Sequence, residues 1–179
     1  GAIEWLEVLV SYNIDIAVIT APYFHNSNSP DGISQYFEDI AAEARLPILL
    51  YNIPQCVGES IPGEVVTKLA RQDQFIGLKD SGGDLTYSSS LLNETPDDFH
   101  ILQGVDGLLI PSLRSGFDGA VSALSNAFPR LIKSAVGSPH RPEASELHQD
   151  VMLPLQKMCL SDGFAPTTKA AMMSRGWLS

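Results

Sequence analysis

The sequence predicts an α/β protein whose core is a parallel β-sheet covered by helices. Short apolar runs alternate with amphipathic stretches through most of the 179 residues, which is typical of strands buried on both faces. Hydrophobic residues make up 44% of the chain and charged residues 18%, which is enough apolar surface for a full core. Five such strands can form an open doubly wound sheet or the later part of an eight-stranded barrel.

The first element is predicted to be a helix, because Ile3, Leu6 and Val10 follow the spacing of a buried helix face. Since the chain opens inside this pattern at Gly1 rather than at a methionine, we expect further sequence upstream. Apolar runs then predict five strands, over residues 14–20, 47–51, 75–79, 100–104 and 119–122.

Helices are predicted between and after the strands. Ile33, Phe37 and Ile40 mark one helix face behind a Ser29 cap, with Pro30 in the first turn. Further helices are predicted over residues 65–69, 85–92, 106–115, 131–136 and 143–160. Pro111 is expected to strain the one over residues 106–115.

The strand pattern stops after Ser122, and the rest of the chain is predicted to be helical. The residues Gly137, Ser138 and Pro139 break the helical pattern at the start of this tail. We therefore predict two domains, an incomplete barrel over residues 1–136 and a helical appendage over residues 137–179.

The charge balance narrows the classes of partner. Twenty-one acidic residues against eleven basic ones give a formal net charge of −10, which disfavours binding to nucleic acid phosphates or to anionic lipid. The two cysteines, Cys56 and Cys159, form no disulfide framework and no zinc-ligand spacing. No apolar run reaches the length of a membrane span. A cytoplasmic protein that binds a small molecule, without metal, is the expectation.

Two predicted strands end in reactive side chains, Tyr51 and Lys79. In a parallel α/β architecture the functional groups lie at the carboxyl ends of the strands. Imine formation requires a neutral lysine amine, and desolvation favours that neutral form. A tyrosine on the next strand could transfer protons to or from a substrate hydroxyl. On spacing alone, a lysine reaching toward solvent and a packed tyrosine is the better interpretation.

Three strings of residues change that balance. Tyr51-Asn52-Ile53-Pro54, then the segment 77–84 (GLKDSGGD), then Gly104-Val105-Asp106 follow in order and spacing. Together they resemble the dihydrodipicolinate synthase and N-acetylneuraminate lyase family, which comprises class I aldolases on a TIM barrel. The resemblance extends to about Pro129 and implies a partial TIM (β/α)8 barrel, strands four to eight, followed by C-terminal helices.

The resemblance also implies roles for individual residues. Lys79 would be the Schiff-base lysine and Tyr51 the catalytic tyrosine. The residues expected to bind the substrate are Ser81, Gly104, Asp106, Val121 and Tyr23. Asp80 and Ser81 could equally hold their own turn backbone. The family's Gly-Thr-Thr-Gly-Glu loop, whose threonines hold the pyruvate carboxylate, is absent from the 179 residues, so we expect no complete active site in this stretch alone.

Departures from the family's subgroups narrow the substrate. Dihydrodipicolinate synthases carry an arginine at the place of Cys56, and a cysteine offers neither its charge nor its fork geometry. Phe24 stands where those synthases have a relay tyrosine, and Tyr23 is the nearest alternative. Sialic acid lyases have a glutamate at the place of Gly107. The strings Gly116-Phe117-Asp118-Gly119 and Ser125-Asn126, with Pro129, resemble the 2-keto-3-deoxy sugar acid aldolases instead.

The sequence therefore predicts an aldolase that cleaves or forms a 2-keto-3-deoxy sugar acid, with pyruvate and an aldehyde as its other reactants. Lys79 would form the imine and Tyr51 would accept the C4 hydroxyl proton, with no metal or organic cofactor implied. Dihydrodipicolinate synthase and a non-catalytic keto-acid-binding protein remain alternatives, as does an unrelated open-sheet domain. By resemblance, a homotetramer is expected.

Overall fold

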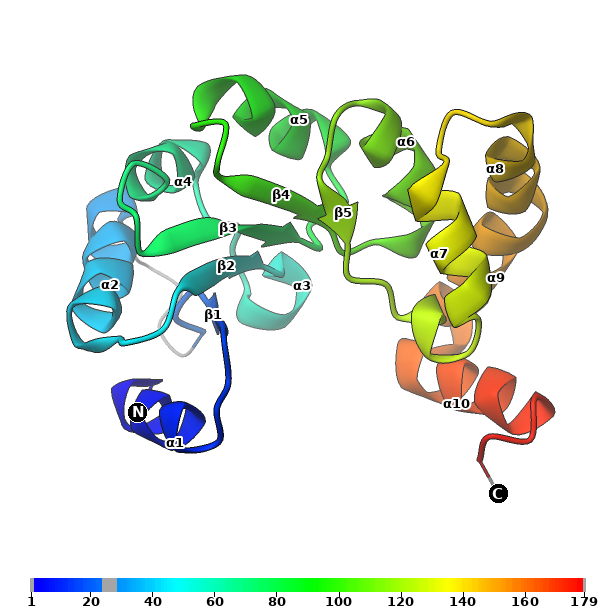
Figure 1. Cartoon of the computed structure of the whole chain (residues 1–179), viewed down its shortest axis with the longest axis horizontal. Helices are drawn as coiled ribbons and strands as arrows, with labels where there is room; N and C mark the ends of the chain where they lie inside the picture. The colour runs from blue at the N-terminus through cyan, green and yellow to red at the C-terminus, as the bar shows by residue number, and fades with distance from the viewer. Residues whose placement is uncertain (1, 24–28, 179) are drawn as a thin grey trace. The chain divides into compact units, whose positions relative to one another are not determined.

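The structure of the chain is a computed structural model that describes residues 2–23 and 29–178. The chain divides into two compact units, Gly1–Leu102 and Gln103–Ser179 (Figure 1). The first unit contains most of the sheet, and the second is mainly helical.

Neighbouring strands form the centre of the first unit. They are β1 (Ala17–Thr20), β2 (Ile48–Asn52), β3 (Phe75–Asp80) and β4 (His100–Gln103), in that spatial order. β1 pairs in parallel with β2, and β2 pairs in parallel with β3. The predicted alternation of parallel strands and helices is confirmed.

The register of β2 and β3 places their last residues opposite one another. Tyr51 pairs with Lys79, and Asn52 pairs with Asp80. Because successive side chains of a strand point to opposite faces, the first pair lies on one face of the sheet and the second pair on the other.

Helices connect the strands of the first unit. They are α1 (Ala2–Ser11), α2 (Pro30–Glu43), α3 (Pro54–Val57), α4 (Gly63–Leu69) and α5 (Leu85–Glu94). α4 packs against both α2 and α5, and Figure 1 shows these three helices following one another along the sheet. The predicted Ser29 cap is confirmed, because its hydroxyl accepts a hydrogen bond from the Gly32 N–H at 3.2 Å.

The core of the first unit lies between these helices and the sheet. Phe37, Leu50, Leu78 and Leu91 are fully buried. Burying side chains of this size contributes about 1.5–3 kcal/mol each. Gly77 allows a close strand approach, since a Cβ at this position would lie 2.3 Å from the backbone oxygen of His100.

The structure departs from the predicted elements at two places in the first unit. β1 begins at Ala17, and Ile14 and Ile16, predicted to lie in this strand, are 40% and 43% exposed. The short helix α3 was not predicted. Pro54, with its fixed φ, occupies the first turn of α3, and Gly58 ends this helix with φ 95°.

The second unit opens with Gln103, the last residue of β4, whose carbonyl accepts a hydrogen bond from the Val121 N–H at 2.9 Å. Val121 follows the short strand β5 (Gly119–Ala120). The helices of the second unit are α6 (Leu109–Arg114), α7 (Pro129–Gly137), α8 (Pro142–Leu147), α9 (Leu153–Asp162) and α10 (Phe164–Ser174). The 3₁₀ turns η1 (Asp106–Leu108) and η2 (Leu124–Asn126) precede α6 and α7.

The tail is helical, as predicted, with two differences in detail. A π-helical turn, η3 (His148–Met152), joins α8 to α9, so the helix predicted over residues 143–160 is one helical segment with a wider turn. α10 was not predicted. Pro111 lies in the first turn of α6, where no intrahelical N–H is needed, and this placement avoids the expected strain.

Buried apolar side chains of α6, α7 and η3 form the core of the second unit, among them Leu109, Ile110, Ile132 and Met152. Beyond α10, the Arg175 guanidinium lies 4.9 Å from the centroid of the Trp177 ring. The predicted division into residues 1–136 and 137–179 stays a prediction.

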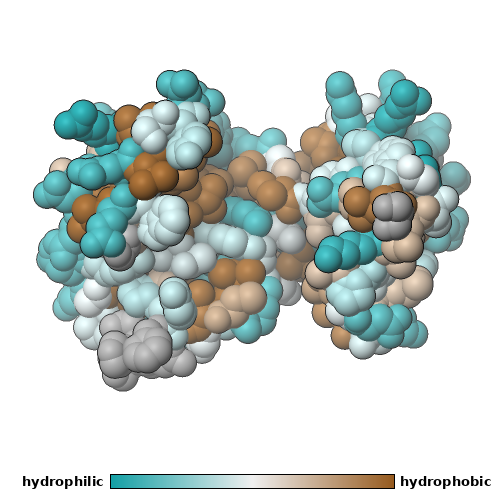
Figure 2. All heavy atoms as spheres, turned by 90° about the horizontal axis from the view of Figure 1, so that it is seen from below, coloured by the Kyte–Doolittle hydropathy of each residue, from teal (hydrophilic) through white to brown (hydrophobic). Residues whose placement is uncertain are grey.

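Hydrophobic side chains reach the surface on α1 and β1. Leu6 of the predicted α1 face is buried, whereas Ile3 and Val10 are 43% and 37% exposed. Trp5 and Val18 are also exposed. Figure 2 shows hydrophobic side chains lying among polar ones on one face of the molecule.

Candidate active site

Lys79 and Tyr51 lie together at the carboxyl ends of β3 and β2. The Lys79 Nζ lies 3.8 Å from the centroid of the Tyr51 ring. Both side chains are partly buried. An amine over an aromatic face is an attractive contact when the amine is charged. The structure thus brings together the two residues predicted to be catalytic, with the amine over the ring face of the tyrosine.

The neighbouring pair, Asn52 and Asp80, is hydrogen-bonded and nearly inaccessible to solvent. The Asn52 Nδ2 donates to the Asp80 Oδ1 at 2.7 Å, and both residues are 1% exposed. The Gly82 N–H donates to the same Oδ1 at 2.9 Å. Of the two roles left open for Asp80, the contact with its own turn is present, and the cross-strand bond to Asn52 adds to it.

Asn52 is also tied to the segment that leads into α4. Its Oδ1 accepts a hydrogen bond from the Ile61 N–H at 3.0 Å. The Tyr87 hydroxyl donates to the Ile61 carbonyl at 2.8 Å. Burial, and secondarily the charge of Asp80, raise the pKa of Tyr87 far above its usual value, so this phenol stays a donor. Three hydrogen bonds thus join Asn52, Asp80, Ile61 and Gly82 into one strand-end network.

Ser81 follows Lys79 by two residues and is buried. Its N–H donates to the Asn52 carbonyl at 2.8 Å, and its carbonyl accepts from the Gln55 Nε2 at 2.9 Å. These contacts fix the backbone of Ser81 against the end of β2. A hydroxyl contact between Ser81 and a substrate stays a prediction.

Tyr23 follows β1 and is 70% exposed. Tyr36 of α2 has a raised pKa. Burial is the main cause, and an electrostatic contribution from the Tyr23 phenol is the second. Phe24 lies outside the described residues. A role for Tyr23 at the substrate stays a prediction.

The other predicted substrate-binding residues, Gly104, Asp106 and Val121, belong to the second unit. Asp106 is buried and accepts hydrogen bonds from the Ser122 hydroxyl and, at 3.3 Å, from the Leu124 N–H. Burial raises the pKa of Asp106, and these hydrogen bonds partly offset that rise. Val121 is 44% exposed. Substrate binding by these three residues stays a prediction.

Two further residues, Cys56 and Asn52, lie near the predicted site. Cys56 is exposed on α3, two residues after Pro54. Asn52 was named only as part of the family string, and no role was predicted for it. The signal that could have found its role is its position beside Tyr51, because equal strand ends place Asn52 opposite Asp80 just as they place Tyr51 opposite Lys79.

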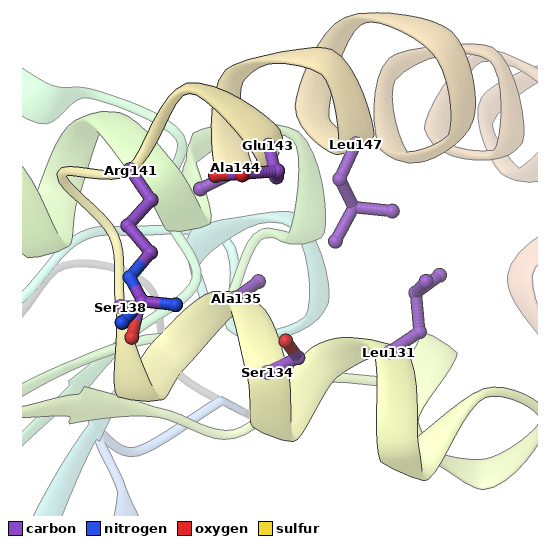
Figure 3. A pocket seen from close by; sticks show the side chains of 8 residues that line it. All are labelled: Leu131, Ser134, Ala135, Ser138, Arg141, Glu143, Ala144 and Leu147. Atoms are coloured by element: carbon purple, nitrogen blue, oxygen red, sulfur yellow. The ribbon is translucent and has the colours of Figure 1, made fainter.

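A cavity of about 330 Å³ lies in the second unit, between α7 and α8. Figure 3 shows Leu131 and Leu147 pointing toward one another, and Arg141 extending toward Ser138. None of the residues predicted for the active site lines this cavity. The chemistry predicted from the sequence therefore has to be sought at the strand ends.

Within residues 2–23 and 29–178, no three side chains of His, Cys, Asp or Glu gather in a way that could hold a metal ion. In that same part of the chain, no helix has the length and apolar character needed to cross a membrane.

Comparison with known proteins gives a family and a fold. The profile of the Dihydrodipicolinate synthetase family matches residues 1–179. The 4-hydroxy-tetrahydrodipicolinate synthase of Listeria monocytogenes is 31% identical over 173 residues, an alignment that covers 95% of this chain and 58% of the relative. That of Methanopyrus kandleri is 33% identical over 167 residues, covering 91% and 55%.

Solved structures agree with the sequence relatives. The 4-hydroxy-tetrahydrodipicolinate synthase of Methylacidiphilum fumariolicum superposes with a TM-score of 0.89 at 33% identity, covering 99% of this chain and 60% of that one. The dihydrodipicolinate synthase of Cyanidioschyzon merolae gives 0.88 at 29% identity, covering 98% and 60%. The chain thus spans between 55% and 60% of the length of these four relatives.

The structural neighbours are TIM-barrel proteins, and the sheet and helices of this chain correspond to part of such a barrel. The expected fold class, a partial (β/α)8 barrel with C-terminal helices, is confirmed. The match over the full 179 residues shows that the chain belongs to the Dihydrodipicolinate synthetase family.

Proposed function

We propose that the protein containing this chain is a class I aldolase that forms a Schiff base between Lys79 and pyruvate. The observation that carries this proposal is the Lys79 Nζ at 3.8 Å from the centroid of the Tyr51 ring, at the carboxyl ends of adjacent parallel strands. This is the edge at which barrel enzymes place their reacting groups. The family match supports the proposal.

The reaction begins when the neutral Nζ attacks the C2 carbonyl carbon of pyruvate. Loss of water leaves a protonated imine, which withdraws electrons from C3. Removal of a C3 proton gives an enamine, whose C3 attacks the carbonyl carbon of an aldehyde and forms the new carbon–carbon bond. The Tyr51 phenol delivers a proton to the resulting alkoxide, and hydrolysis of the imine frees Lys79.

For the aldehyde, the relatives favour the synthase reaction, in which pyruvate condenses with aspartate semialdehyde. The relatives described above are named 4-hydroxy-tetrahydrodipicolinate synthase or dihydrodipicolinate synthase. The sugar acid aldolase reaction, which the sequence motifs predicted first, has no such support. We therefore place the synthase ahead of the sugar acid aldolase.

One observation keeps the sugar acid aldolase as a second candidate. Cys56, at the place where synthases are expected to carry an arginine for the carboxylate of the second substrate, is an exposed thiol on α3. A thiol gives no bidentate contact to a carboxylate. Coupled assays with pyruvate and either aspartate semialdehyde or glyceraldehyde distinguish the two reactions. Turnover with glyceraldehyde alone would overturn the assignment to the synthase.

Trapping of the imine tests the Schiff base itself. Incubation with pyruvate and borohydride, followed by peptide mass spectrometry, should show a reduced pyruvate adduct on Lys79. The K79R variant should lose the adduct, whereas K68R should keep it, because Lys68 is engaged with Glu38 at 3.0 Å on the helical side. Reversible pyruvate binding without an adduct would instead indicate a non-catalytic keto-acid-binding protein.

Three further expectations belong to this proposal. They are a homotetramer, a cytoplasmic location, and an inactive fragment when residues 1–179 are produced alone. Sedimentation of the whole protein tests the first, and localisation in cells tests the second. Steady-state assays of the 179-residue chain beside the whole protein test the third, and equal activity would contradict it.

A further inference from the structure

The ends of β2 and β3 carry two successive cross-strand pairs on opposite faces of the sheet. Tyr51 and Lys79 form the pair with the reactive groups, and Asn52 and Asp80 form the next pair along the strands. Tyr51 and Asn52 are adjacent in the chain, as are Lys79 and Asp80, so the backbone of one pair continues directly into that of the other. A shift of either strand end would move both pairs together.

The Asn52–Asp80 pair has the features of a fixed contact. Its hydrogen bond is 2.7 Å long, and both side chains are 1% exposed. Ile61 and Gly82 supply the further backbone donors, at 3.0 Å to Asn52 and 2.9 Å to Asp80. A buried amide and carboxylate that are paired in this way are costly to separate, because the Asn52 Nδ2 donor would be left unpaired away from water and the Asp80 Oδ1 would lose one of its two donors.

Gly82 closes over this pair. A Cβ added to Gly82 would lie 3.0 Å from the Asn52 Nδ2 and 3.1 Å from the Asp80 Oδ1. These are the two atoms of the hydrogen bond. A larger residue at this position therefore requires the two bonded atoms to shift by a few tenths of an ångström, and the nearest atoms to its Cβ belong to Asn52, Asp80 and Pro54 rather than to Lys79 or Tyr51.

We propose that Asn52 is a positioning residue, which holds Lys79 over Tyr51 through its hydrogen bond to Asp80. This inference rests on the proposed function for its chemical meaning, since the positioned amine is the one that attacks pyruvate. A misplacement of about 1 Å at a reacting group can cost two orders of magnitude in rate. Asn52 itself lies on the other face of the sheet and acts through the backbone.

Exchange of the two side chains distinguishes this role from a simple contribution to stability. In N52D, two carboxylates face one another and the donor is lost. In D80N, the Oδ1 that accepts both hydrogen bonds is kept. In the double variant N52D/D80N, the amide at position 80 can donate to the carboxylate at position 52, which still accepts from the Ile61 N–H, whereas the Gly82 N–H loses its acceptor because it donates to the same Oδ1 position.

The position of the amine is measurable by NMR on the whole protein with lysines labelled at Cε. The ring current of Tyr51 should displace the Lys79 ε-methylene protons upfield, and Y51L should remove that displacement. We expect N52D to reduce the displacement by about half or more, because the strand ends separate. D80N should keep it, and N52D/D80N should restore part of it, because the cross-strand bond is recovered but the Gly82 bond is not.

G82A and Y87F complete the set. G82A should reduce the upfield displacement, because its Cβ meets both atoms of the Asn52–Asp80 bond. Y87F removes the hydrogen bond to the Ile61 carbonyl without touching that pair. It is therefore the control for lost stability, and it should leave the displacement unchanged.

The reaction arm uses the whole protein and pyruvate with borohydride. We expect adduct formation on Lys79 to be about tenfold slower in N52D at saturating pyruvate, with little change in the pyruvate concentration for half-maximal rate. N52D/D80N should recover part of the rate.

The outcomes separate the two proposals. If wild-type protein forms no adduct, the proposed function fails, while the NMR arm still decides the positioning role. If N52D keeps the displacement, or if the double variant restores none of it, the positioning role is wrong whatever the labelling shows. Equal loss in Y87F and N52D would also overturn it.

Discussion

Each unit contains a buried carboxylate at the end of a strand or shortly after it, and the two carboxylates hold different segments of the chain together. Asp80 of the first unit accepts hydrogen bonds from a side chain on the neighbouring strand and from its own turn. Asp106 of the second unit accepts them from Ser122 and Leu124, which precede and begin η2. The first carboxylate fixes the register of two strands, whereas the second holds a turn to a loop. The donors around a buried carboxylate thus decide what it fixes.

The largest expected effect comes from a substitution that breaks the strand-end network around Asn52 and Asp80. N52L keeps the number and branching of the side-chain heavy atoms but leaves the Ile61 N–H without its acceptor and removes one of the two donors to the Asp80 Oδ1. We expect the free energy of unfolding, measured with urea, to fall by about 3 kcal/mol. N93L is the matched control, because Asn93 is exposed on α5. A loss in N52L no larger than that in N93L would contradict the network's role.

A smaller decrease in the free energy of unfolding, about 1 kcal/mol near neutral pH, is expected for D106N in the second unit. The pKa of Asp106 is raised in the folded chain. Its stabilising contribution is therefore complete below the unfolded pKa and is lost as pH rises through the folded pKa. The difference in unfolding free energy between wild type and D106N should be larger near pH 4 than near pH 7. A difference that grows with pH would contradict this sign.

The smallest effect concerns His148 in the π turn of the second unit. Within the described residues, its buried Nδ1 has no hydrogen-bond partner. Burial, and secondarily the charge of Arg114, lower its pKa. The unfolded chain therefore takes up the proton first, and stability falls as pH drops from the unfolded pKa through the folded one. H148Q should flatten the urea-derived stability curve across that interval, and an unchanged slope would count against the assignment.

The sequence predicted most of the fold because the strands and helices follow local patterns. The apolar runs over residues 47–51 and 75–79 gave β2 and β3 nearly to the residue. β1 proved shorter than its apolar run, because Ile14 and Ile16 lie exposed before the strand. α3 and α10 were missed, since four residues are too few for periodicity and α10 has only a weak apolar face.

The candidate site was predictable in part. Tyr51 and Lys79 could be brought together because parallel strands end at the same edge, and their motif is specific. The same argument places Asn52 opposite Asp80, but it does not say that their side chains are hydrogen-bonded, because that bond depends on the exact register and the side-chain conformations of residues 28 positions apart in sequence. The sequence left a turn role and a functional role for Asp80 equally open; the structure shows the turn contact with Gly82, and the second partner, Asn52, lies on another strand.

The placement of the two tryptophans offers a practical consequence. Trp5 lies on α1 of the first unit, and Trp177 lies beyond α10 of the second, against Arg175. Each unit therefore carries its own fluorophore, one largely open to water and one beside a cation. Single-tryptophan versions of the chain would let denaturation of each unit be watched by its own emission, and would reveal whether they melt as one cooperative block or in sequence.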